Sequence, residues 1–202
     1  MRELKIKLTF TEECLGTANA DKDIHREFIA SKAPDAKNRE EEIAAIGVEE
    51  VIQKAMTVFP RDNDGNPVFF DYQIKGFFKD ACSALQRCKG EEISKYSTKI
   101  KAYKKVIDGC IFPQPRMIKI DMRGAEIGSC QRPLRAHTAQ GDRVALANSE
   151  TIPEGSTIEF GVVCLSDEYE NAVIEWLNYG KFKGLGQWRN GGKGRFTYEV
   201  VE

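Results

Sequence analysis

The order in which two kinds of apolar pattern follow each other most constrains what this chain can fold into. In the first ten residues, apolar residues alternate with charged or hydroxyl-bearing ones, which is the pattern of a strand with one buried face. The apolar positions are Leu4, Ile6, Leu8 and Phe10. Between residues 72 and 87 apolar residues recur at helical spacing. Further strands are predicted near residues 117–120, 158–164 and 196–200, and a second helix around Trp176. The predicted order is strand, helix, strand, strand, helix, strand.

This order is typical of the ferredoxin-like or RRM-like βαββαβ fold of the α+β class. We expect the strands near Leu4, Ile118, Phe160 and Tyr198 to form one antiparallel sheet, with both helices on the same face. Two excursions interrupt the pattern. Residues 11–70 form a large insertion after the first strand, with a short helix expected between residues 40 and 56 and a turn at residues 62–67. Residues 123–153 form a second insertion between the middle strands.

Residues 181–196 join the second predicted helix to the last strand and combine glycines with cations. The glycines of this region are Gly180, Gly184, Gly186, Gly191, Gly192 and Gly194, and the cations are Lys181, Lys183, Arg189, Lys193 and Arg195. Glycine lets the backbone turn its N–H groups toward an anion, so this segment is typical of a phosphate-contacting loop, with Trp188 able to stack on a base. The alternative is a flexible connection whose charges keep the protein soluble.

Charge is distributed unevenly along the chain, although the 202 residues sum to a formal charge of −1. Residues 21–50 hold nine acidic and five basic residues, whereas residues 75–105 hold nine basic and three acidic ones. This contrast favours a protein with a local nucleic-acid face and argues against coating of nucleic acid by the whole surface. The alternative is that both segments are solvated helix faces.

Composition excludes several other classes. The six cysteines are scattered without a CxxC pair and only two histidines are present, so we expect reduced thiols, no zinc and no cofactor. The sequence contains no run of about 18 apolar residues, and its first ten residues carry charges within their apolar alternation, unlike a signal peptide. These features predict a cytoplasmic protein without a membrane partner.

Four blocks of the sequence carry a resemblance to a known superfamily. They are Cys14-Leu15-Gly16-Thr17, Gln73-Ile74-Lys75-Gly76 within residues 67–79, Pro153-Glu154-Gly155-Ser156-Thr157-Ile158-Glu159-Phe160, and the glycine-rich residues 184–196. In their order and spacing the chain resembles the repeat-associated mysterious protein (RAMP) superfamily, the backbone and processing proteins of CRISPR effector complexes. It departs from that pattern where Phe69-Phe70-Asp71-Tyr72 replaces small residues, in its acidic insertion, and in its short length. The opening block and residues 28–32 also look like bacteriophage proteins, which makes a phage-encoded relative plausible.

The resemblance implies a single RAMP-like domain over residues 1–202 that binds single-stranded RNA in the cytoplasm of a bacterium or an infected host cell. Residues 123–153 would be a thumb that wedges between bases, for which the alternative is a solvated β-hairpin. Other CRISPR effector subunits and further copies of the chain along the RNA are the implied partners. The implied nucleic-acid-binding residues are Lys75, Gly76, Lys79, Arg132, Arg135, His137, Arg143, Lys183, Gly184, Gly186, Trp188, Arg189, Lys193 and Arg195.

Three functions stay open at this point. The first is a non-catalytic RNA-binding protein, and the second is a phage-encoded interaction protein of the anti-CRISPR type that mimics a subunit and blocks an effector complex. The third is a RAMP-type endoribonuclease, for which the acid–base and metal-ligand candidates are Asp21, Asp23, His25, Asp62 and His137. Because these residues form no cluster in the sequence, the absence of catalysis is the favoured expectation.

Overall fold

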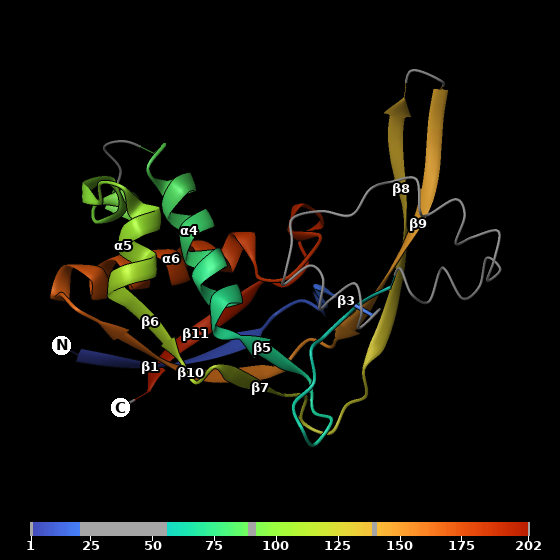
Figure 1. Ribbon diagram of the computed structural model, residues 1–202, viewed down its shortest axis with the longest axis horizontal. Coiled ribbons are helices and arrows are strands. Elements are labelled where there is room, and N and C mark those ends of the chain that lie inside the picture. The colour runs from blue at the N-terminus through green and yellow to red at the C-terminus, as the bar shows by residue number, and fades with distance from the viewer. Residues whose placement is uncertain (1, 21–55, 89–91, 139–140, 202) are drawn as a thin grey trace.

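The computed structural model describes residues 2–20, 56–88, 92–138 and 141–201. Figure 1 shows helices on one side of a sheet and a long hairpin that projects from its end. The acidic segment 21–50 and the helix expected between residues 40 and 56 lie outside the described residues. The described part of the chain thus mixes helices and antiparallel sheet, as expected for the α+β class.

The main sheet has six strands, and each of its described pairs is antiparallel. Its strands are β1 (Arg2–Phe10), β5 (Val68–Phe70), β6 (Ile111–Gln114), β7 (Met117–Asp121), β10 (Thr157–Cys164) and β11 (Phe196–Val201). The order along the sheet is β11, β1, β10, β7 and β5, and β6 pairs with β10 beside β7. Since β6 and β7 bond successive parts of β10, they act as one strand interrupted at Pro115 and Arg116. The prediction that the strands around Leu4, Ile118, Phe160 and Tyr198 share one antiparallel sheet is confirmed.

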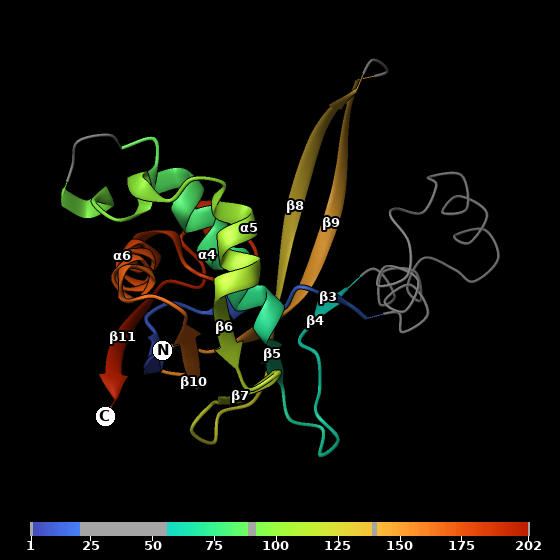
Figure 2. The same ribbon diagram turned by 60° about the vertical axis from the view of Figure 1, so that its left-hand side comes forward.

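Helices α4 (Asp71–Leu85) and α6 (Asp167–Lys183) cover the same face of this sheet, as Figures 1 and 2 show. Helix α4 turns six residues at helical spacing into the core, among them Phe78, whose ring lies 5.3 Å from that of Trp176 on α6. Helix α6 begins where the Ser166 hydroxyl accepts the N–H of Glu168, and three acidic residues in its first turn match the positive end of the helix dipole. The core between helices and sheet therefore matches the apolar pattern of the sequence.

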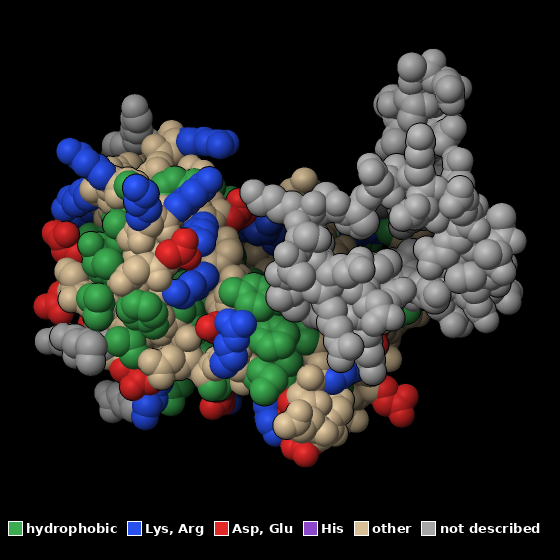
Figure 3. Space-filling model, in the orientation of Figure 1, with side chains coloured by type: hydrophobic (Ala, Val, Ile, Leu, Met, Phe, Trp, Pro, Cys, Tyr) green, Lys and Arg blue, Asp and Glu red, His purple; other side chains and the backbone are tan. Residues whose placement is uncertain are grey.

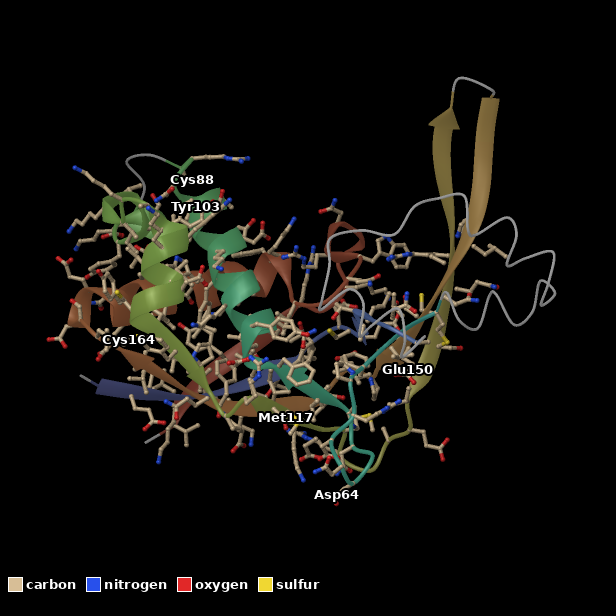
Figure 4. The ribbon with its side chains drawn as sticks, viewed as in Figure 1. Asp64, Cys88, Tyr103, Met117, Glu150 and Cys164 are labelled. Atoms are coloured by element: carbon tan, nitrogen blue, oxygen red, sulfur yellow. The ribbon has the colours of Figure 1, made fainter. Side chains whose placement is uncertain are left out.

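A smaller sheet holds the base of the projecting hairpin. It contains β2 (Cys14–Leu15), β3 (Ala18–Asn19), β4 (Thr57–Val58), β8 (Gly128–Thr138) and β9 (Gly141–Ile152). Strands β8 and β9 pair without interruption from Gly128–Thr151 to Thr138–Gly141. Glu150, labelled in Figure 4, accepts the N–H of Phe59 at 2.9 Å and pairs with Arg61 at 2.6 Å. The last part of the first insertion, which contains Phe59 and Arg61, is thus bonded to the hairpin.

Sequence patterns did not predict the segment between α4 and the middle strands. It contains two short 3₁₀ turns, η1 (Glu92–Ser94) and η2 (Ser97–Lys99), and helix α5 (Tyr103–Cys110), which has only one buried residue, Ile107. The buried carboxylate of Glu175 on α6 accepts the N–H groups of Tyr96 and Ser97 at 2.7 and 2.8 Å. A lysine-rich segment is therefore held by a polar contact from another element as well as by Tyr96, Ile100 and Ile107, which pack in or against the core.

None of the helices in the described ranges is both long enough and apolar enough to span a membrane.

Candidate functional site

The four sequence blocks that carry the RAMP resemblance meet near the end of β1. The Gln73 side-chain amide donates a hydrogen bond of 2.6 Å to the Thr17 hydroxyl, and the Cys14 thiol donates one of 3.4 Å to the carbonyl oxygen of Leu185. The N–H of Gly155 donates to the last carbonyl of β1 at 2.8 Å. Residues up to 171 positions apart along the chain thus come into direct contact.

The glycine-rich segment is a closely packed loop. Gly184, Gly186 and Gly194 have φ values of 77°, 83° and 70°, in the region where side chains are strained. A Cβ on Gly186 would lie 2.7 Å from the carbonyl oxygen of Leu15, and one on Gly194 would collide with the carbonyl oxygen of Leu185. These glycines are therefore needed for the loop to pack on itself and on β2.

Backbone hydrogen bonds already use several N–H groups of this loop. Leu185 donates to Gly194 at 2.8 Å, and Gly194 donates to Glu13 at 2.8 Å. Within the described part of the chain, the N–H groups of residues 186–190, 193 and 195 have no backbone acceptor. The expectation that loop N–H groups meet an anion thus narrows to these residues, of which 186–190 are consecutive.

The loop cations all have partners within the protein. Arg189 pairs with Asp80 on α4 at 2.7 Å, and Lys193 pairs with Glu13. The hydrogen bond to Glu13 raises the pKa of Lys193 above its ordinary value. Lys183 donates to the Asn190 side chain at 3.1 Å, and Arg195 donates to the carbonyl oxygen of Phe182 at 3.1 Å. Because two of these cations face carboxylates, their attraction for phosphate is weaker than their number suggests.

A cavity of about 350 Å³ lies between α4 and the loop. Its walls are Thr17, Phe69, Gln73, Gly76, Phe77, Leu185, Gly186 and Arg189. A Cβ on Gly76 would meet no atom within 4 Å, so the missing side chain leaves this wall open. Two aromatic rings and a few polar groups in a space of this size are typical of a small ligand site.

Arg132 on β8 contacts the loop at Trp188. Its Cζ lies 5.1 Å from the centre of the indole ring, and its Nη2 donates to Gln187 Oε1 at 3.2 Å. Its Nε and Nη1 are buried and have no hydrogen-bond partner within the described ranges. Buried donors without an acceptor are costly, and an anionic or carbonyl oxygen that reached this guanidinium would remove that cost. The Trp188 side chain beside it is 42% exposed.

Lys75 and Lys79 lie on a different side of α4 from the cavity. The Lys75 ammonium donates to the carbonyl oxygen of Asp108 on α5 at 3.2 Å and lies 4.8 Å from the centre of the Phe112 ring. Lys79 pairs with the Asp108 carboxylate at 2.6 Å. Of the three predicted residues on α4, the structure brings only Gly76 to the glycine-rich loop.

The remaining predicted residues of the hairpin lie toward its tip. In the register of β8 and β9, Arg135 faces Val144, His137 faces Asp142, and Arg143 faces Ala136. The side chains of Arg135, His137 and Arg143 fall outside the described part of the structure. Their assignment to a nucleic-acid site stays a prediction from the sequence.

Of the five catalytic candidates, the structure describes the side chain of Asp62, whereas that of His137 lies outside the described part. Asp21, Asp23 and His25 lie outside the described residues. The Asp62 carboxylate closes a turn by accepting bonds from Asn66, which lower its pKa, and it also pairs with Lys119 at 3.3 Å. In the described ranges, no three His, Cys, Asp or Glu side chains are placed to hold a metal ion.

Some residues of this region were not predicted from the sequence. Gln73 and Asp80 share a face of α4 with Gly76 because they are spaced by three and four residues, so helical spacing from Gly76 could have found them. Gln187 and Glu13 give no such signal, since their partners Arg132 and Lys193 are far away along the chain.

No protein-family model and no curated protein matches the chain. Among solved structures, the chain is similar to one in the "Cryo-EM structure of the Type III-B Cmr-beta bound to cognate target RNA", with 11% identity and a TM-score of 0.46. The similarity covers all of this chain and 60% of that one. A similarity of this size assigns neither family nor function.

Proposed function

We propose that this protein binds single-stranded RNA without cleaving it, at the surface formed by the hairpin, the glycine-rich loop and the cavity beside α4. The observation that carries the proposal is the Arg132–Trp188 pair, in which two buried guanidinium nitrogens have no partner among the described residues. An RNA phosphate or a base carbonyl provides the acceptor that these N–H groups lack. Guanidinium planes and aromatic rings are also the groups on which unstacked bases pack.

The architecture supports the same proposal. If β6 and β7 are taken as one strand, the order β11, β1, β10, β7 is consistent with a ferredoxin-like sheet that has α4 and α6 on one face. The insertions 11–70 and 123–153 and the loop 181–196 then belong to one RAMP-like domain over residues 1–202. The contacts between Thr17 and Gln73 and between Cys14 and Leu185 are consistent with this arrangement, because they join the blocks of the resemblance.

In this proposal the RNA backbone follows the loop, and one base enters the cavity beside Gly76. The N–H groups of residues 186–190 and the Arg132 guanidinium contact phosphate, while Lys75 and Lys79 keep their places against α5. Lys193 and Arg189 contribute less, since Glu13 and Asp80 neutralise them. Other CRISPR effector subunits and further copies of the chain along the RNA are the partners proposed from the resemblance.

Fluorescence anisotropy with labelled single-stranded RNA tests this function. Arg132→Ala should weaken binding and reduce the slope of log K against log salt by about 0.7 if the guanidinium contacts one phosphate. Arg132→Lys keeps the charge and loses the planar fork, so it should keep the slope and still lose affinity.

Lys5→Ala is the matched control, because Lys5 lies on β1 between core residues and points to the face of the sheet away from the helices. The control should bind RNA as the unaltered protein does. Equal loss in Arg132→Ala and Lys5→Ala would mean that RNA is attracted by overall charge and that the Arg132 site is not used.

A further inference from the structure

Phe70, Tyr72 and Arg116 form a cluster that we call the aromatic platform. The rings of Phe70 and Tyr72 are stacked, with centres 5.4 Å apart and an interplanar angle of 14°. The Cζ of Arg116 lies 5.6 Å from the centre of the Phe70 ring and 5.5 Å from that of Tyr72. One guanidinium therefore contacts two stacked rings.

Three different elements hold this platform in place. Phe70 is the last residue of β5, Tyr72 belongs to the first turn of α4, and Arg116 lies in the break between β6 and β7. Asp71 fixes Arg116 twice, through an ion pair of 2.5 Å and through its N–H, which donates to the Arg116 carbonyl at 3.1 Å. The platform is thus preorganised, and a ligand would not have to order it.

The platform nevertheless faces solvent. The Arg116 side chain is 66% exposed and Tyr72 is 46% exposed, and Met117, which pairs with Phe70 across the strands, is exposed as well. Partial burial raises the pKa of Tyr72, so the ring stays neutral at physiological pH. Figure 3 shows hydrophobic side chains gathered near the foot of α4 with Lys and Arg side chains beside them, and Figure 4 labels Met117 at the same place.

The platform adjoins the cavity of the proposed RNA site. Gln73, a wall residue of the cavity, accepts the N–H of Phe70 at 2.7 Å and donates to Thr17 at 2.6 Å. An RNA strand that leaves the cavity over Gln73 reaches the platform at Tyr72, the preceding residue of α4. Residues 69–72 are also where the sequence departs from the RAMP pattern, so the rings are a feature of this chain.

We infer that the aromatic platform is a second stacking site, which takes an unpaired nucleobase of the same single-stranded RNA. This inference rests on the proposed function. Stacked rings with a guanidinium are a surface on which any base can pack, whatever the RNA sequence. Because Asp71 already neutralises Arg116, the platform adds stacking and no phosphate contact.

Replacing Tyr72 by alanine tests the inference through affinity and salt dependence together. With a labelled RNA of about 12 nucleotides, Tyr72→Ala should weaken binding by about five- to 150-fold and leave the salt slope unchanged. Tyr72→Phe keeps the ring and should retain affinity. Ile93→Ala, which removes an equally exposed apolar side chain on η1, should also retain it.

A second measurement uses RNA that carries a photoreactive uridine. Crosslinks should map to the peptides that contain Tyr72 and Met117 as well as to the glycine-rich loop. If RNA binds the unaltered protein but Tyr72→Ala binds equally well and no crosslink reaches these peptides, the platform is not a base site and faces another partner. If the unaltered protein binds no RNA, the proposed function itself is overturned, and this inference with it.

Discussion

Two glycines of the loop differ in their surroundings but have nearly the same positive φ, which makes them a matched pair. Gly186 and Gly192 have φ values of 83° and 84°. A Cβ on Gly186 would lie 2.7 Å from Cys14 Sγ and from the carbonyl oxygen of Leu15, whereas one on Gly192 would have its nearest neighbour 3.7 Å away, on the Arg195 guanidinium. Alanine at such a positive φ costs about 1–2 kcal/mol at either position. The forced displacement at Gly186 adds about 1–3 kcal/mol.

We therefore expect Gly186→Ala to lower the free energy of unfolding by about 2–5 kcal/mol and Gly192→Ala by about 1–2 kcal/mol. Urea denaturation followed by the emission of the buried Trp176 measures both values. The difference between the two variants isolates the contact of the loop with β2. Equal losses would refute the packed loop and return residues 181–196 to a flexible connection between helix and strand.

Three further outcomes follow from the described contacts. Glu175→Ala leaves the N–H groups of Tyr96 and Ser97 without their acceptor, so the free energy of unfolding should fall by about 1–3 kcal/mol for each buried donor that stays unpaired; an unchanged urea midpoint would contradict this. Burial raises the pKa of Cys82 to about 11 and that of Cys164 to about 12, so in mildly alkaline buffer both thiols stay protonated and should react with a disulfide reagent only after unfolding, whereas the exposed Cys88 reacts in the native state. Both folded-state pKa values exceed the ordinary thiol value of 9.0. The contribution of the two protonated thiols to the free energy of unfolding is therefore complete below pH 9.0 and should decline as pH rises from 9.0 toward the raised pKa values. Labelled single-stranded RNA should remain intact on a gel with and without Mg²⁺, and cleavage that disappears in Asp21→Ala or His25→Ala but not in Arg132→Ala would replace binding by a ribonuclease function.

The sequence predicted the elements whose apolar residues face a single core. The alternation through Ile6 and Leu8 and the helical spacing through Phe77 and Phe78 reflect burial against the same layer, so period alone locates them. The turn at Ser97 escaped prediction because Glu175, a residue of another element, holds it. Helix α5 escaped it because Ile107 is its one buried residue. The long strands β8 and β9 were expected only as the β-hairpin alternative for residues 123–153, and their partner is mainly each other.

The candidate site could be predicted only in part, because contacts between distant elements determine which of its residues are free to bind a ligand. The glycine pattern located the loop, but it did not distinguish glycines that contact a ligand from those that pack against Leu15 and Leu185. The basic residues identified a charged segment, yet Lys79 and Arg189 turned out to be paired with Asp108 and Asp80. Ion pairs across distant elements depend on the tertiary fold, which charge counting along the chain does not contain.

The emission of Trp188 during titration with single-stranded RNA is the most direct test of the proposed site. Trp176 is fully buried and Trp188 is 42% exposed, so a change on binding reports mainly on the loop. We expect a saturable change in emission that is absent in Trp188→Phe, and an affinity loss of about 1–3 kcal/mol in Trp188→Ala. RNA that binds while the emission of Trp188 stays constant, and that binds Trp188→Ala with unchanged affinity, would contradict the claim that RNA lies at the Arg132–Trp188 pair.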